Sequence, residues 1–98
     1  MTEGDIVFIL EGAGSIIEGI FTNEKSEGMY GIILETNKTI FKRSDNIFED
    51  RLTAHARWIV RRFKRLEAQG IPSAEIVFTE EDRPALELAT ELWPEDML

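Results

Sequence analysis

Residues 42–65 constrain the fold more than any other stretch, because their apolar residues recur with the 3.6-residue period of an α-helix. The resulting apolar stripe consists of Phe48, Leu52, Ile59, Phe63 and Leu66. The polar residues Ser44–Asn46 suit a helix start, and Gly70 is typical of a helix end. The sequence therefore predicts a long amphipathic helix from about residue 47 to residue 69.

The side of this predicted helix that faces away from the apolar stripe is basic. Residues 42–65 hold 8 of the 11 Lys and Arg residues of a chain whose formal net charge is -8. Because arginines follow Trp58 by three, four and seven residues, its indole can stack against guanidinium groups. We call this surface the Trp/Arg face; it consists of Arg51, Arg57, Trp58, Arg61, Arg62 and Arg65.

Two interpretations of the Trp/Arg face remain open from the sequence. An aromatic residue framed by arginines suits a hot spot for a protein partner, and it also suits base stacking with phosphate contacts, to which Lys42 and Arg43 would add. Alternatively, a second, acidic helix covers Trp58, and its Glu87 and Glu91 pair with the arginines. In that case the face is structural.

The first 43 residues have the pattern of short β-strands. Four strands are expected, at about residues 5–10, 15–22, 29–36 and 38–42. The first is an almost continuous apolar run, which is typical of a strand buried on both faces. Residues 23–28 are expected to form a polar loop, and Gly19 inside the second strand indicates a bulge, a bend or a close backbone approach. Short strands with interior glycines favour a curled sheet or a small barrel.

The last third of the chain predicts a short strand and a second helix. The strand is expected at Ser73–Thr79, after which Thr79 can cap a helix that Pro94 ends. The predicted fold class is therefore α+β: a curled four- or five-stranded antiparallel sheet or small barrel, a long amphipathic helix, a short strand and a second helix. We expect one domain over residues 1–98, with a β-rich part at 1–45 and a helix-strand-helix part at 46–98.

Residues 5–48 resemble the Sm-like fold, the five-stranded barrel of RNA-associated Sm proteins and their bacterial relatives. The matching pieces are VFIL before a turn, IIEGIFT, MYGIILE and KRSDNIF. The chain departs from the family motif at Tyr30, where an asparagine is typical, and at Ser44, where a glycine is typical; Arg43 keeps the motif's residue type. The resemblance implies an SH3-like or Sm-like barrel and a ring or paired assembly.

Composition excludes several kinds of chemistry. The chain has no cysteine for disulfides or thiolate ligands and one histidine, His55, which is expected to be packed and hydrogen-bonded rather than catalytic. The acidic run at residues 80–82 fits the start of a helix better than a cation site. We expect no catalytic residue, metal or cofactor. No apolar run is long enough to span a membrane, and the N-terminus lacks a signal-peptide pattern, so a cytoplasmic location is expected.

These observations favour a small non-enzymatic binding or regulatory protein that acts through protein–protein contacts on the Trp/Arg face, with a protein partner or a second copy of the chain. One alternative is an RNA-binding or single-stranded nucleic-acid-binding Sm-like module. The other is an acidic mimic that occupies a nucleic-acid-binding protein. Its acidic surface would consist of Glu80, Glu81, Asp82, Glu87, Glu91, Glu95 and Asp96. Neither a membrane nor a small-molecule substrate is indicated.

Overall fold

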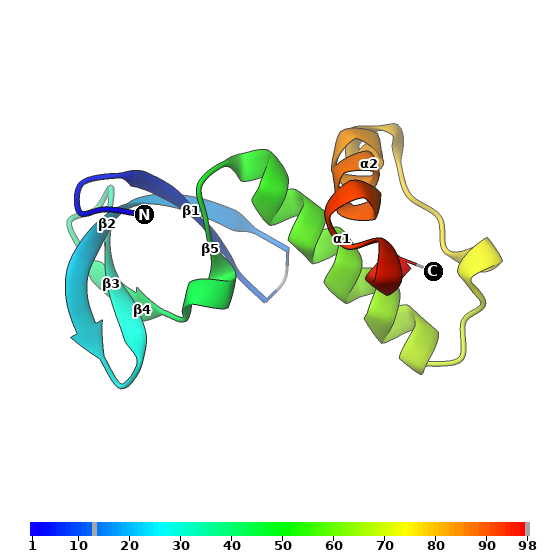
Figure 1. The fold of residues 1–98 in the computed structure, drawn as a ribbon, viewed down its shortest axis with the longest axis horizontal. Helices are drawn as coiled ribbons and strands as arrows, with labels where there is room; N and C mark the ends of the chain where they lie inside the picture. Colours follow the sequence, from blue (N-terminus) through cyan, green and yellow to red (C-terminus); the bar gives the residue numbers. More distant parts are fainter. Residues whose placement is uncertain (13, 98) are drawn as a thin grey trace. The chain divides into compact units, whose positions relative to one another are not determined.

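The protein is an α+β structure, as Figure 1 shows for the computed structural model, which describes residues 1–12 and 14–97. Two compact units make up the chain, Met1–Ala54 (unit 1) and His55–Leu98 (unit 2). In chain order a five-stranded antiparallel sheet precedes a long helix and a second helix, which confirms the predicted fold class.

Unit 1 is built on an open, curled sheet rather than a closed barrel. Its strands are β1 (Ile6–Leu10), β2 (Ile16–Ser26), β3 (Met29–Leu34), β4 (Thr39–Lys42) and β5 (Ile47–Phe48). Their order is β4-β3-β2-β1-β5, with every neighbouring pair antiparallel. The fifth strand was predicted at residues 73–79, and that prediction was wrong: β5 comes from residues expected to begin the helix.

Two turns of the sheet differ in how well the sequence predicted them. The expected loop at residues 23–28 shrinks to Glu27 and Gly28, both with positive φ, because β2 continues through Ser26. Such a two-residue turn with positive φ at both positions matches the twist of the strands that it joins. The turn before β4 contains Asn37 at φ 65°, as expected for an asparagine in a tight hairpin.

The core of unit 1 lies on one face of the sheet. It consists of Val7, Ile9, Phe21, Ile32 and Ile47, all buried. Gly19 pairs in register on this sheet, and a Cβ built on it would lie 2.4 Å from Cγ2 of Ile32. Of the three explanations for this glycine, the close approach is therefore the one observed. The predicted burial of β1 on both faces holds at Leu10, which is 3% exposed, but is wrong at Ile6, which is 59% exposed.

Helix α1 spans Arg51–Ala68 and begins four residues later than predicted. Residues 44–46 form a short 3-10 helix instead of capping α1. The cap is Asp50, whose carboxylate accepts hydrogen bonds from the backbone N–H of Thr53 at 2.7 Å and from its hydroxyl at 3.0 Å. The predicted end is confirmed, since Gly70 follows α1 with φ 84°. Phe48 and Leu52 do not belong to the buried stripe: Phe48 lies in β5, and Leu52 is exposed.

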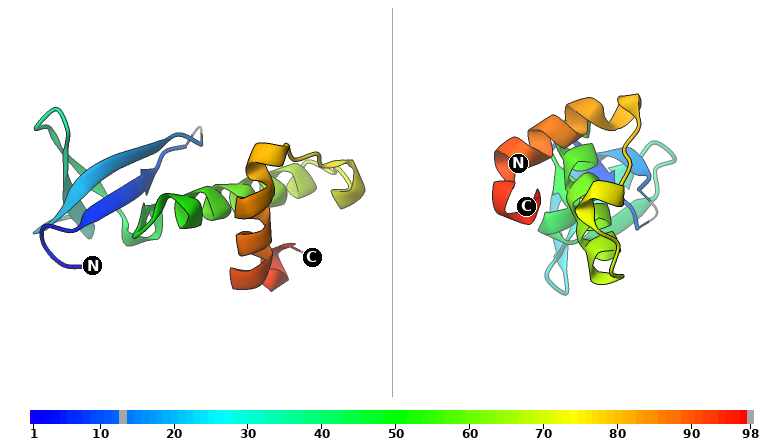
Figure 2. Two further views of the ribbon diagram at one scale, coloured as in Figure 1. Left: turned by 90° about the horizontal axis from the view of Figure 1, so that it is seen from above. Right: turned by 90° about the vertical axis from the view of Figure 1, so that its right-hand side faces the viewer.

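Unit 2 consists of most of α1, helix α2 (Arg83–Leu92) and short 3-10 helices at Ser73–Glu75, Glu80–Asp82 and Pro94–Met97. Figure 2 shows α2 crossing α1. Small residues allow this contact, because the buried cluster consists of Ala56, Ile59, Val60, Ala85 and Ala89. The strand predicted at residues 73–79 does not form; no other strand exists among the described residues of this unit to pair with it. No helix in the described ranges is long and apolar enough to cross a membrane.

Candidate functional site

The structure divides the predicted Trp/Arg face between the two units. Arg51 belongs to unit 1, where its guanidinium lies 5.2 Å from the ring centroid of Phe8 and its Nη1 donates to the carbonyl of Ile16 at 3.4 Å. The other five residues, Arg57, Trp58, Arg61, Arg62 and Arg65, belong to unit 2. The six residues are therefore not grouped within one unit.

Within unit 2, arginines of this face stack on aromatic rings of the same unit. The guanidinium of Arg62 lies 5.6 Å from the ring centroid of Trp58, as the four-residue spacing predicted, and 5.5 Å from that of Phe78. The guanidinium of Arg57 lies 5.0 Å from the ring centroid of Trp93. Trp58 is half-buried against the alanine-rich core cluster. Stacking of this kind contributes to folding and leaves less of each cation available to a partner.

Asp96 provides a carboxylate that pairs with this basic surface. Its Oδ1 lies 3.1 Å from Nζ of Lys64, and its Oδ2 lies 3.8 Å from Nη1 of Arg57. The sequence had placed such pairing on Glu87 and Glu91, which are exposed on α2. The C-terminal part of the chain thus contacts this surface through Asp96 and Trp93.

His55 is half-buried and hydrogen-bonded. Its Nε2 lies 3.0 Å from Oδ1 of Asp82, and its ring centroid lies 5.8 Å from that of Trp58. Asp82 also accepts a hydrogen bond from the backbone N–H of Thr79 at 3.3 Å. Burial raises the pKa of Asp82, but the hydrogen bonds from Thr79 and His55 outweigh burial and hold this pKa below its usual value. Asp82 also forms a capping box with Thr79 at the 3-10 helix Glu80–Asp82, and its hydrogen bond to His55 fits the packed role expected for that histidine.

The remaining predicted residues are scattered. In unit 1, Nζ of Lys42 pairs with Glu11 at 3.0 Å, and Arg43 is exposed before the first 3-10 helix. In unit 2, Glu80 pairs with Arg83 at 3.2 Å. The exposed carboxylates among the predicted acidic residues are those of Glu80, Glu81, Glu87, Glu91 and Glu95.

A surface that the sequence did not reveal lies on the face of the sheet opposite the core. Ile6 is paired with Ile20, and Ile20 with Ile33, so one isoleucine from each of β1, β2 and β3 stands in a row across the strands. Their neighbours in sequence, Val7, Phe21 and Ile32, point into the core. Ile6 is 59% exposed, Ile20 is 45% exposed and Ile33 is half-buried. We call Ile6, Ile20 and Ile33 the isoleucine surface.

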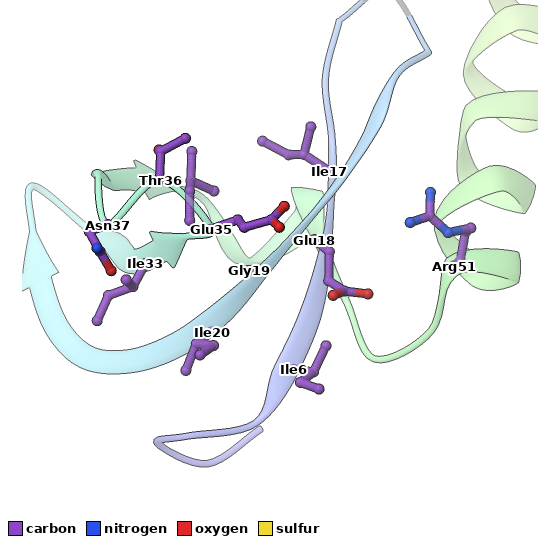
Figure 3. A pocket seen from close by; sticks show the side chains of 11 residues that line it. Ile6, Ile17, Glu18, Gly19, Ile20, Ile33, Glu35, Thr36, Asn37 and Arg51 are labelled. Atoms are coloured by element: carbon purple, nitrogen blue, oxygen red, sulfur yellow. The ribbon is translucent and has the colours of Figure 1, made fainter.

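The isoleucine surface borders a hollow of about 790 Å³. Figure 3 shows its lining, to which all three isoleucines contribute together with Glu18 and Glu35. The hollow lies beside the end of β3, since Leu34 and residues 35–37 line it, and beyond Leu34 β2 pairs with β1 alone. A smaller hollow of about 310 Å³ adjoins Ile6 and is lined by Met1, Asp5, Val7 and Glu49 as well. The arrangement is an open apolar groove with carboxylates around it.

Consecutive apolar residues were the available signal for this surface. Ile16–Ile17 and Ile32–Ile33 place apolar side chains on both faces of their strands. Such strands require cover on both faces, or else one apolar face stays exposed. The row itself was not predictable, because it depends on the pairing register of three strands.

Comparison of the chain with protein-family models, with curated proteins and with solved structures finds no match.

Proposed function

We propose that this protein is a small non-enzymatic binding protein that acts through protein–protein contacts, and that the isoleucine surface is its main contact. The single observation that carries the proposal is the row of Ile6, Ile20 and Ile33 across the centre of the sheet, in which Ile6 and Ile20 are exposed. Isolated exposed apolar residues are ordinary, whereas a contiguous apolar row beside a hollow is characteristic of an interaction site.

A protein partner is favoured by the open shape of the hollow and by the charges around it. The hollow is open, with more than half of Ile6 exposed, so it suits a protruding apolar side chain of a partner more than an enclosed small molecule. Nucleic acid is less favoured, because Glu18 and Glu35 line the hollow and the cations Arg57, Arg62 and Lys42 already have partners within their own units.

A selection experiment tests this function. A random peptide library is selected on the full chain and counter-selected on an Ile6→Thr, Ile20→Thr variant, since threonine keeps the β-propensity of these exposed positions. A Val77→Thr variant is the matched control, because Val77 is 75% exposed in unit 2. We expect enriched peptides that bind the unchanged chain and the control but lose binding to the double variant.

Two results would contradict the proposal. One is a selection that yields no peptide above background. The other is a set of peptides that bind the double variant as well as the unchanged chain while circular dichroism shows both to be folded. Binding of single-stranded RNA that survives the isoleucine changes would favour the nucleic-acid alternative instead.

A further inference from the structure

We infer that the isoleucine surface takes a basic amphipathic helix of a partner protein, an inference that rests on the proposed function and specifies its partner. Three observations carry it: the direction of the row, the hydrogen-bonding state of its strands and the charge around it.

The row has a length that suits a helix. Adjacent strands lie about 4.8 Å apart, so the Cα atoms of Ile6 and Ile33, two strands apart, are separated by roughly 10 Å. Helical residues i and i+7 lie about 10.5 Å apart along the axis, with i+3 and i+4 between them on the same face. A helix that lies across β1, β2 and β3 can therefore place successive apolar residues along the row. Met1, which lines the smaller hollow beside Ile6, extends the apolar contact at that end.

The three strands that carry the row are paired with one another at the row itself. β2 pairs with β1 and β3, β1 also pairs with β5, and β3 also pairs with β4. A partner strand therefore cannot insert between the three isoleucines, and a ligand that lies across the row must contact side chains on the sheet face. An amphipathic helix, whose own backbone is satisfied internally, binds in this way.

The charge around the row selects a basic partner. Glu18 and Glu35 line the larger hollow, Asp5 and Glu49 line the smaller one, and residues 1–54 hold ten acids against five bases. Glu18 and Glu35 are exposed and form no ion pair with any residue in the described ranges. Arg51 also lines the larger hollow, but its guanidinium is engaged with the ring of Phe8 and the carbonyl of Ile16. Lysines or arginines beside the apolar stripe of a partner helix would face these carboxylates.

The same charges argue against the other occupants. In a two-fold dimer of this chain, the carboxylates around one row would face the same carboxylates of the second copy. An anionic membrane surface would be repelled in the same way. A partner helix with basic flanks satisfies both the apolar row and the charge around it.

Two synthetic amphipathic peptides test the inference on the full chain. Both carry leucines at i, i+4 and i+7; one has lysines and arginines beside the leucines, and the other has glutamates there. We expect the basic peptide to bind about tenfold more tightly at low salt, since each exposed ion pair contributes modestly. Glu18→Lys with Glu35→Lys should reverse the preference. The control, Glu87→Lys with Glu91→Lys on the exposed side of α2, changes the net charge equally and should leave the preference as it was.

The outcomes separate the inference from the proposed function. Equal binding of the two peptides, or a preference that the control changes as much as the Glu18 and Glu35 variant does, overturns the inference. If selected peptides depend on Ile6 and Ile20 but carry acidic or neutral flanks, the proposed function stands and the inference fails. Binding to vesicles that contain phosphatidylserine, or self-association in sedimentation equilibrium, overturns it if either depends on the two isoleucines.

Discussion

Gly19→Ala is expected to destabilise unit 1 by about 1 to 3 kcal/mol, which is the usual effect of forcing one extra methyl group into a packed core. The added Cβ would lie 2.4 Å from Cγ2 of Ile32 and 3.1 Å from the carbonyl oxygen of Ile33. Ile32 is fully buried, so its side chain has no solvent into which it can move. The neighbouring strands β2 and β3 must then separate locally, which weakens their packing against the core.

Gly12→Ala is the matched control for this change. A Cβ built on Gly12 meets no atom within 4 Å, and its φ lies outside the left-handed region. The free energy of unfolding should therefore change by no more than about 0.5 kcal/mol. Comparison of the two variants separates the loss of glycine's flexibility in the unfolded chain, which both share, from the steric contact at Gly19.

A double-mutant cycle with Ile32→Ala locates the cause. Ile32→Ala alone should cost about 2 to 5 kcal/mol, because it leaves a cavity in the core. In that background Cγ2 of Ile32 is absent, so Gly19→Ala should cost at least about 1 kcal/mol less than it does in the unchanged chain. Urea titrations followed by the NMR amide signals of β2 and β3 measure these values for unit 1 itself. Additive effects of the two changes would refute the steric explanation.

Two further predictions concern unit 2, whose unfolding the fluorescence of its two tryptophans reports. Asp82→Asn should destabilise unit 2 at neutral pH; because the pKa of Asp82 is lower in the folded state, the difference between the variant and the unchanged chain should disappear as the pH falls below about 4, through the folded-state pKa. A difference that persists at low pH would argue against the carboxylate as the cause. Asp96→Asn removes the partner of Lys64 and Arg57, and these partly exposed pairs should be worth less than about 1 kcal/mol, with the loss smaller in high salt. A loss that salt does not change would contradict ion pairing.

The helical half of the fold was predictable to the extent that its signals are local. The helical period predicted α1, and Gly70 marked its end correctly. Its start was predicted too early because Phe48 fits the apolar stripe as well as it fits a strand, and only the pairing with β1 decides between the two. Residues 73–79 show the reverse error, because they have strand-like composition but form no strand. A strand needs a second strand beside it, and the tertiary fold decides whether one is there.

The candidate site was less predictable than the fold. Stacking of Arg62 on Trp58 was predicted correctly from the four-residue spacing, yet spacing does not show that Trp93 and Phe78 supply rings for Arg57 and Arg62. Those rings lie far along the chain from the helix. The isoleucine surface depends on the register of three strands, and a shift of one residue would bury these side chains and expose their neighbours.

Charged side chains of unit 2 are engaged within that unit, whereas apolar side chains of unit 1 are left outside its core. Added salt should affect interactions of these two kinds differently. In unit 2, Arg57 and Arg62 of the Trp/Arg face stack on aromatic rings, and Arg57 also pairs with Asp96, so their charge contributes to folding. In unit 1 apolar side chains stand outside the core, beside Glu18 and Glu35, which form no ion pair with a described residue. High salt screens the exposed charges but leaves apolar burial intact. A basic helical ligand should therefore lose its advantage over an acidic one as salt rises, while the binding that depends on Ile6 and Ile20 remains; if all binding disappeared with salt, charge alone would hold the ligand and the isoleucine surface would not be its site.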